Sequence, residues 1–531
     1  MVFGGVRGFV VKSPSPRLSI VVAEAPLPLG EYVELRYGSG GERVALAVVS
    51  NSSYEQAVPQ SALSYLSPRV GGVESLKVSF TSLYVIAEIS GGRVGIPTYP
   101  IPPDTPVTLA SPETLSAVYG GLEEDVRLGV LACRGPRVEV RVNPDKLAKH
   151  LLIAGATGSG KSNTVAVLAD RLSTIGAPVV IFDVHGEYNI VPEDGDTSRV
   201  KIIKALINPL RMPPRALASI IIPEPQARRQ RRILRRAIEK VLKKVRDKAE
   251  KEGASEITAL AMLVNEEKEK RPKPKGVRSV EDENMGGIVK GLMEMLMEEV
   301  QNIKSPSPRE DPDIVAVKSK VLEKVEEFFE VTPVDIGVEQ VTRYIEPGRI
   351  LVVDASNLDD EQRRWMLKVM ADEILAKLKG GFLESVVLVV EEAPLFIGAG
   401  MSHPVKQSLQ RFAREARKFG GSLIVVSQRP RSLDINVVSQ LQNFVFLRMV
   451  QEEDIRAVMN IADNLDENLA KTIPSLPDGR AIVMGEWLGK FPAVVDIDLH
   501  KGKKVGATPP LKEIWRELKE RKRKPTFNLE I

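Results

Sequence analysis

The chain has 531 residues with 74 Lys or Arg and 70 Asp or Glu, and its formal net charge of +4 is too small by itself to indicate a nucleic-acid partner. Its single cysteine excludes a disulfide framework, and its four histidines argue against a zinc site with several ligands. No apolar run approaches the roughly 18 residues of a membrane-spanning helix, and the N-terminal residues lack the apolar core of a signal peptide. We therefore expect a cytoplasmic protein of roughly two to four domains with no membrane contact.

Residues 1–140 contain short Val- and Ile-rich runs that are separated by Gly, Pro and Ser. Short strands at regular spacing, with turn residues between them, are typical of a small β-barrel or β-sandwich. This region contains no recognisable set of catalytic side chains. We predict an N-terminal all-β domain that serves a purpose other than catalysis.

The next segment, "HLLIAGATGSGKSNTVAVLADRL" (150–172), contains the pattern GxxxxGK[ST] between an apolar strand and a helix. Such a loop turns successive backbone N–H groups toward the β-phosphate of a nucleotide. The lysine then spans the β- and γ-phosphates, and the hydroxyl after it ligates Mg²⁺. We predict that ATP and Mg²⁺ bind here. The residues predicted to bind the nucleotide are Gly155, Gly158, Ser159, Gly160, Lys161, Ser162 and Asn163.

A second buried strand follows in "APVVIFDVHGEYN" and ends at Asp183. Because the P-loop also follows a strand end, Asp183 is expected at the same edge of the sheet. Its carboxylate could join the outer ligands of the metal, or it could form hydrogen bonds with the local backbone. The sequence leaves both roles open.

Residues 210–335 differ from the flanking segments because they form long, charged, helical stretches interrupted by "EKRPKPKG" and "KSPSPREDPD". Strands and helices alternate again from "GRILVVDAS" (348–356) onward. We therefore predict one α/β core, made of residues 141–209 and 336–500, with a helical insertion and a basic C-terminal extension at 501–531.

The insertion includes a strongly basic segment, residues 227–252, with twelve Lys or Arg and four acidic residues. Its apolar residues recur at helical spacing, which predicts a helix with one packed face. The basic face could contact DNA phosphates. It could equally be a solvated face or a contact with another subunit.

Two adjacent carboxylates, Glu391 and Glu392, follow the apolar run of "VVLVVEEAPLF" (386–396). Near a P-loop, one carboxylate can hold the waters of a Mg²⁺ ion while the next polarises an attacking water. We predict that Glu391 acts with Ser162 at the metal and that Glu392 is the general base. Aspartate is more usual at the first position, so Glu391 is a departure from the common pattern.

A further buried strand in "GGSLIVVSQRP" delivers Gln428 to the same edge of the sheet. A glutamine amide there can accept a hydrogen bond from the attacking water and donate one to the γ-phosphate. We therefore count Gln428 with Lys161 and Glu392 as a candidate catalytic residue. The alternative is that it caps a loop.

The motifs "GATGSGKSNT", "FDVHGEY", "VVEEAP", "AREARKFG" and "VVSQRPRSLD" occur in this order, and together they resemble the HerA branch of the HerA–FtsK DNA translocases. The resemblance extends over nearly the whole chain. It implies a RecA-like α/β P-loop ATPase core with a small N-terminal β-barrel and an inserted helical bundle. It also implies a homohexameric ring that pumps double-stranded DNA with ATP and works with the NurA nuclease in DNA-end resection for recombinational repair.

The same resemblance implies roles for basic residues. Arg417, in "RFAREARKFGG", matches the family's arginine finger, which acts on the ATP of a neighbouring subunit, and Arg414 could be a second contact or a salt-bridge partner. Lys149 stands where the family often has an arginine, so it is a candidate contact to phosphate or adenine. Lys406, in "IGAGMSHPVK", is a candidate DNA contact on a loop of the ring channel.

Two other functions are compatible with the P-loop. One is a related ring motor of the conjugation or secretion type that moves a different polymer, although such motors usually carry a membrane anchor. The other is a nucleotide-gated scaffold, which has no need for Glu392, Gln428 and an arginine finger together. Stimulation of ATP hydrolysis by duplex DNA, by single strands or by neither separates the three.

Overall fold

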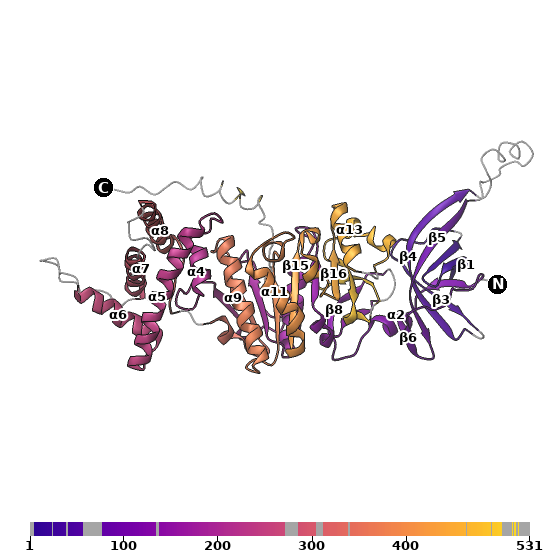
Figure 1. Cartoon of the computed structure of the whole chain (residues 1–531). Coiled ribbons are helices and arrows are strands. Elements are labelled where there is room, and N and C mark those ends of the chain that lie inside the picture. Colours follow the sequence, from indigo (N-terminus) through magenta and orange to yellow (C-terminus); the bar gives the residue numbers. More distant parts are fainter. Residues whose placement is uncertain are drawn as a thin grey trace, which may run out of the picture.

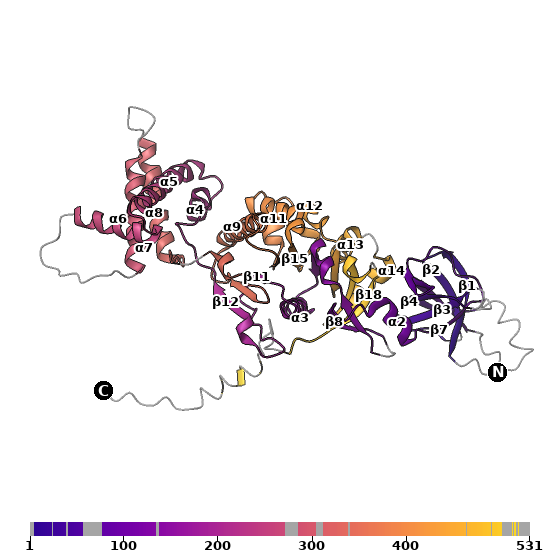
Figure 2. The same cartoon turned by 90° about the horizontal axis from the view of Figure 1, so that it is seen from below.

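The computed structural model is elongated, with a β-barrel at one end, a large sheet in the middle and a group of helices at the other end (Figures 1 and 2). The structure describes residues 5–23, 25–38, 41–56, 77–133, 137–270, 285–303, 312–337, 340–462, 465–489 and 491–501, together with residues 512, 515, 516 and 519. The predicted C-terminal extension thus lies almost entirely outside the described residues. None of the described helices has the length and apolar character that crossing a bilayer requires.

The N-terminal strands form a closed antiparallel barrel. The strands are β1 (Val6–Ser15), β2 (Leu18–Ala23), β3 (Tyr32–Tyr37), β4 (Arg43–Gln56), β5 (Lys77–Ser90), β6 (Arg93–Gly95) and β7 (Pro106–Leu109). Six of them follow the order β2-β1-β7-β3-β4-β5, and β2 closes the barrel by pairing with β5, while β6 extends β5 as a hairpin. Alternating residues of β2 are buried, as period-2 patterning requires. The prediction of a small barrel is confirmed.

The central sheet has eleven strands in the order β12-β13-β11-β14-β15-β10-β16-β17-β18-β8-β9. They are β8 (Val126–Leu131), β9 (Glu139–Val142), β10 (Leu151–Ala154), β11 (Val179–Asp183), β12 (Val200–Lys204), β13 (Ile350–Asp354), β14 (Val386–Val390), β15 (Gly421–Ser427), β16 (Asn443–Leu447), β17 (Arg480–Gly485) and β18 (Ala493–Ile497). Pairing is parallel from β12 to β16 and antiparallel beyond β16. Every residue of β10, β11, β13, β14 and β15 is buried, which explains their unbroken apolar runs.

Helices cover both faces of this sheet. Leu152 and Ala154 of β10 share a core with α9 and α11, whereas Leu151 and Ile153 face a second core that includes α3. Figure 2 shows the same division, with α9, α11 and α12 on one side and α3 on the other. The helices outside the insertion are α2 (Pro112–Tyr119), α3 (Lys161–Thr174), α9 (Asp360–Lys379), α10 (Pro394–Ile397), α11 (Pro404–Glu415), α12 (Ile435–Val438), α13 (Glu452–Ile461) and α14 (Glu467–Ala470).

Strands β8 and β9 belong to the central sheet, although the predicted N-terminal domain of residues 1–140 includes β8 and part of β9. The sequence could not show this because β8 pairs with β18, more than 360 residues later. The barrel is also fastened to the core. The Tyr119 hydroxyl donates to the Pro492 carbonyl at 2.8 Å, and the Val494 N–H donates to the Tyr32 hydroxyl at 3.0 Å. The other predicted domain boundaries stay predictions.

Between β12 and β13, the described residues form five α-helices. They are α4 (Pro214–Ile221), α5 (Arg228–Glu252), α6 (Glu256–Lys270), α7 (Met285–Asn302) and α8 (Pro312–Val331). Leu234 and Val241 of α5 pack into one apolar core with Leu260, Leu296 and Val325. The predicted apolar stripe of the basic helix is therefore its packed face.

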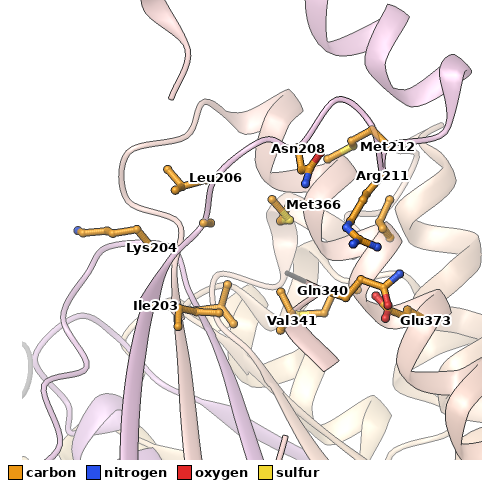
Figure 3. A pocket seen from close by; sticks show the side chains of 14 residues that line it. Ile203, Lys204, Leu206, Asn208, Arg211, Met212, Gln340, Val341, Met366 and Glu373 are labelled. Atoms are coloured by element: carbon orange, nitrogen blue, oxygen red, sulfur yellow. The ribbon is translucent and has the colours of Figure 1, made fainter. Parts of the chain in front are cut away.

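The chain enters and leaves these helices at one place. Ile207 and Val334 form a parallel bridge, and the Asn208 amide donates to the Ile336 carbonyl at 2.9 Å. Figure 3 shows the mainly apolar pocket beside this crossing, of about 80 Å³, with Met366 of α9 among its lining residues. The two crossing segments connect the helices to the edge of the sheet at β12 and β13.

We predict that Gly129→Ala will detach β8 from the sheet and lower thermal stability. A Cβ at Gly129 would lie 2.1 Å from the Asp496 carbonyl oxygen of β18, which cannot move without breaking the ladder. A loss of roughly 2–4 kcal/mol is expected for such overpacking. Thermal unfolding should show it as a lower Tm.

The matched control is Gly95→Ala in β6, where a Cβ would have nothing within 4 Å. Its Tm should stay near that of the unchanged protein. Equal Tm values for the two variants would contradict the placement of β8.

Candidate functional site

The loop between β10 and α3 has the shape of a phosphate cradle. Gly158 and Gly160 have φ values of 77° and 110°, which side chains disfavour. At Gly155 a Cβ would lie 2.5 Å from the Ser159 hydroxyl and 2.8 Å from Leu447 Cβ. The Ser159 hydroxyl donates to the Ala156 carbonyl at 2.7 Å. These contacts fix the loop at the amino end of α3, where backbone N–H groups can bind an anion.

Lys161 is a buried cation in this loop, with 9% of its surface exposed. Burial lowers its pKa, whereas the carboxylates of Glu392 and Glu391 act in the opposite direction. Its ammonium donates to the Ala156 carbonyl at 3.0 Å, the one hydrogen bond that it makes within the described part of the chain. Because an ammonium can donate three, Lys161 retains the capacity to bind phosphate oxygens.

Glu392 is linked to the P-loop through Gln428. The Gln428 amide donates to the Glu392 carboxylate at 2.5 Å, and its oxygen accepts from the Thr157 hydroxyl at 2.6 Å. His185 Nε2 lies 3.7 Å from the same carboxylate. The Glu392 side chain is 27% exposed, so water can reach it. The sequence did not single out His185 or Thr157.

The backbone of Glu392 is strained, because its φ of 43° lies in the left-handed region. A residue is held in such a conformation only when its surroundings determine it. The next residue, Ala393, donates its N–H to the Val426 carbonyl of β15 at 3.0 Å. The end of β14 is thereby fixed against the strand that carries Gln428.

The predicted metal ligands Glu391 and Ser162 meet at the hydroxyl of Tyr188. This hydroxyl donates to the Glu391 carboxylate and lies close to the Ser162 side chain. Burial raises the pKa of Glu391 to about 8, and the nearby carboxylates act in the same direction. The Glu391 carboxylate and the Ser162 hydroxyl both supply oxygen, which is the ligand atom that Mg²⁺ prefers. Tyr188 is a member of this group that sequence reasoning missed.

Asp183 lies at the predicted edge but is engaged with its own loop. Its carboxylate accepts the N–H groups of His185, Gly186 and Tyr188 at 2.8–3.0 Å. Of the two roles that the sequence left open for Asp183, hydrogen bonding with the local backbone is the one that the structure shows. This turn is what presents His185 and Tyr188 to the two glutamates.

Asn163 turns its side chain away from the loop. Its amide donates to the Asp498 carbonyl at 2.9 Å, and its oxygen accepts the His500 N–H at 2.9 Å. The side chain therefore ties the segment after β18 to α3. A nucleotide contact by Asn163 stays a prediction.

Arg417 and Lys149 are not brought to the P-loop of their own chain. Arg417 lies in the 3-10 helix η4 (Ala416–Phe419) just before β15, and Lys149 ends the 3-10 helix η1 (Pro144–Lys149) just before β10. Both precede their strands, whereas the P-loop follows β10. At about 3.3 Å per residue the two edges are roughly 13 Å apart or more. Nucleotide binding by Lys149 is therefore not supported within one chain.

The basic groups at this amino edge differ in their partners. Lys149 Nζ lies 3.4 Å from a Glu486 oxygen. Arg414 and Arg417 are exposed, and neither forms an ion pair with any residue that the structure describes. Arg417 is thus available to another molecule. Its predicted role at a neighbouring ATP stays a prediction.

His150 braces this edge and was not identified from the sequence. It is 1% exposed, its Nε2 donates to the Ala413 carbonyl at 2.6 Å, and its Nδ1 accepts the Leu423 N–H at 3.0 Å. Burial lowers its pKa to about 4, and the charge of Arg417 adds to this effect. The neutral imidazole therefore fixes the end of α11 next to Arg417.

The structure bears on the expectation that Lys406 contacts DNA. Its ammonium is paired with Asp434, and the side chain is only 15% exposed. The ammonium also lies 3.5 Å from the Gly398 carbonyl. A lysine held in this way is a structural ion pair of the loop and not a free contact for DNA.

Comparisons with known proteins give a consistent result. Residues 126–374 match the family described as "Helicase HerA, central domain". The chain is similar to the "DNA double-strand break repair helicase HerA" of Saccharolobus solfataricus, with 31% identity over 97% of this chain and 96% of the relative. It is 32% identical to the protein of that name in Sulfolobus acidocaldarius, over 97% of both chains. The structure of VirB4 of Thermoanaerobacter pseudethanolicus covers 73% of this chain and 98% of VirB4, with 18% identity and a TM-score of 0.48.

We predict that His150→Asn will weaken the pH dependence of stability between pH 6.5 and 4. Because the folded pKa is about 4 and the unfolded value is near 6.5, the unfolded chain binds more protons in this window. Stability is therefore retained above pH 6.5 and lost as pH falls, by roughly 3 kcal/mol from this residue. Urea unfolding at several pH values measures it.

His150 already holds an L-residue at a φ of 61° and a ψ of 162°, and asparagine can accept the Leu423 N–H, so the variant should fold. The unchanged protein, unfolded in urea at the same pH values, is the reference. An unchanged profile in His150→Asn would show that the buried imidazole does not titrate as described.

Proposed function

The chain belongs to the HerA helicase family, and we propose on this premise that it is an ATP-driven motor that moves double-stranded DNA through a homohexameric ring. It is an ATP-hydrolysing enzyme of the helicase or translocase type, as the family membership establishes. One observation carries the mechanistic part of the proposal. Lys161, Glu392 and Gln428 converge at one edge of the sheet, while Arg417, which has no ion pair within the described ranges, lies at the opposite edge.

Each residue of the converged group has a separate task. Glu392 takes the proton of an attacking water, and Gln428, which donates to Glu392, orients that water. Lys161 places its charge on the phosphates. Ser162 and Glu391 would hold Mg²⁺, which when bound neutralises phosphate charge. The hydroxyl of Tyr188 orients the Glu391 carboxylate.

The opposite placement of Arg417 supports a ring. In a head-to-tail assembly, one face of each subunit meets a different face of the next, and six such contacts can close. The amino edge of one sheet can then face the P-loop of the neighbour. Arg417 would spread the transition-state charge there, and Lys149 lies on the same edge.

We further propose that the barrel receives the NurA nuclease in DNA-end resection for recombinational repair. The support is the resemblance of the whole chain to its family and the position of the barrel at one end of the molecule (Figure 1). The barrel contributes none of the side chains described at the P-loop. The hydrogen bond of Tyr32 in β3, together with that of Tyr119 in α2, would carry a force on the barrel into the core.

We predict that Glu392→Gln will bind ATP with Mg²⁺ but turn over at least ~100-fold more slowly, because the general base is lost. Lys161→Ala should instead lose affinity for the nucleotide. Nucleotide binding by fluorescence and phosphate release, measured with and without duplex DNA, separate the two effects.

Glu384→Gln is the control, because Glu384 is exposed and lies before β14, at the opposite end of that strand from Glu392. Its turnover should be unchanged. Normal turnover by Glu392→Gln would remove this residue from the mechanism. Stimulation by single strands alone, or by neither form of DNA, would contradict the duplex substrate.

We predict that Arg417→Ala will assemble and bind ATP but hydrolyse it ~10³-fold more slowly, as expected for loss of an arginine finger. Mixing it with Glu392→Gln subunits should restore some activity, since some boundaries then pair an intact Glu392 with an intact Arg417. Lys418→Ala, at the adjacent exposed lysine, is the control and should hydrolyse normally.

Fluorescence exchange between labelled subunits must show that the rings mix. If they mix and activity stays at the level of the separate variants, Arg417 does not act across a boundary. Full activity in a monomeric form would lead to the same conclusion.

A further inference from the structure

A cleft between α4 and the first half of α5 is lined mainly by arginines. Its volume is about 650 Å³, and Glu239 is the one acidic residue among those lining it. The arginines are Arg215, Arg228, Arg231, Arg232, Arg235 and Arg236. Six cations against one carboxylate leave the lining with a net charge of +5. Such a concentration of charge is unfavourable unless an anion balances it.

Most of these guanidinium groups are available. Arg235 pairs with Glu239 at 2.7 Å, and Arg231 donates to the Pro225 carbonyl at 2.8 Å. The other four are exposed and have no hydrogen bond or ion pair with any residue in the described ranges. These four are Arg215, Arg228, Arg232 and Arg236.

The second half of α5 is different, although it is also basic. Lys240 and Lys244 pair with Glu299 of α7 at 3.3 and 2.6 Å. Lys248 pairs with Glu252 and with Glu266 of α6 at 3.2 and 2.8 Å. These lysines hold the helices together. The high charge of α5 therefore has two parts, and structural pairing accounts for only the second.

The chemistry of the cleft fits a row of phosphates. Guanidinium groups bind phosphate oxygens in pairs, and this half of α5 uses arginine throughout, whereas the second half is mostly lysine. From Arg228 to Arg236 the helix rises about 12 Å. This length exceeds the size of one phosphate group and matches several successive phosphates along a nucleic-acid strand. A free phosphate would occupy only part of it.

An acidic protein is a poorer match. Protein interfaces are anchored by large apolar or aromatic side chains in a buried centre. The lining residues of this cleft other than the arginines are Ala218, Ser219 and Glu239, and none of them can serve as such an anchor.

We propose that this cleft binds the sugar–phosphate backbone of DNA, without reading its sequence, at a site separate from the P-loop. The inference rests on the proposed function only for the identity of the polymer. The position of the cleft in the fold is suited to DNA binding. The cleft lies on the helices that follow the carboxyl end of β12, and that end belongs to the same edge of the sheet as the P-loop.

The test is binding of a fluorescent duplex of random sequence to the full chain, measured by anisotropy over a range of salt concentrations. The variant is Arg232→Gln with Arg236→Gln. The matched control is Lys243→Gln with Lys251→Gln, which removes the same charge from exposed positions of the same helix. ATP hydrolysis without DNA should be equal in all three proteins.

The cleft variant should bind the duplex roughly tenfold more weakly near physiological salt and lower the slope of log K against log salt by about 2, because two phosphate contacts are lost. The control should match the unchanged chain. If both variants lose duplex affinity equally, or the cleft variant loses none, the proposed DNA binding by the cleft is wrong and the proposed function stays intact. If the unchanged chain does not bind the duplex, both the DNA-binding cleft and the proposed function are overturned. If the cleft variant loses binding only to an acidic protein, the cleft belongs to a protein partner.

Discussion

The two edges of a parallel sheet differ, and the function of this chain depends on that difference. Every strand from β12 to β16 runs in the same direction, so its carboxyl end reaches one edge and its amino end the other. The P-loop, Glu392 and Gln428 follow strands, whereas Lys149 and Arg417 precede them. One chain can therefore hold Glu392 and Gln428 beside its phosphate loop, whereas its own Arg417 lies at the other edge of the sheet. In the proposed ring, Arg417 of a second copy would complete the site.

Strand β10 connects the two edges. At its carboxyl end it becomes the phosphate loop, and at its amino end His150 is hydrogen-bonded to the end of α11 and to β15. A four-residue strand that is buried along its whole length is rigid. The helix end before Arg417 is thus held by the strand that holds the phosphates. In a ring, a displacement at one ATP would be passed to the boundary with the next subunit through this strand.

The parts of the site that the sequence predicted are those fixed by local pattern and by the rule of parallel strands. A P-loop needs glycines at fixed spacing, and Glu392 and Gln428 each follow an apolar run that can only be a buried strand. The remaining features depend on partners far along the chain. Tyr188 acquires its role from Glu391, some 200 residues later, and β8 acquires its sheet from β18. Lys406 is a free cation in the sequence, but Asp434 neutralises it in the fold.

The basic helix shows that a count of charges in the sequence does not reveal what those charges contact. A count of twelve basic residues over residues 227–252 cannot distinguish a DNA surface from an internal contact, because both need positive charge. Carboxylates on α6 and α7 pair with three lysines of the second half, Lys240, Lys244 and Lys248, and this pairing contributes to packing. In the first half, Arg228, Arg232 and Arg236 face the cleft and have no such partner among the described residues. Since the crossing at Ile207 and Val334 joins these helices to the carboxyl edge of the sheet, a polymer held in the cleft would pull on the edge where ATP is hydrolysed. In the proposed motor, these arginines, next to a connection to the ATP site, would hold the DNA.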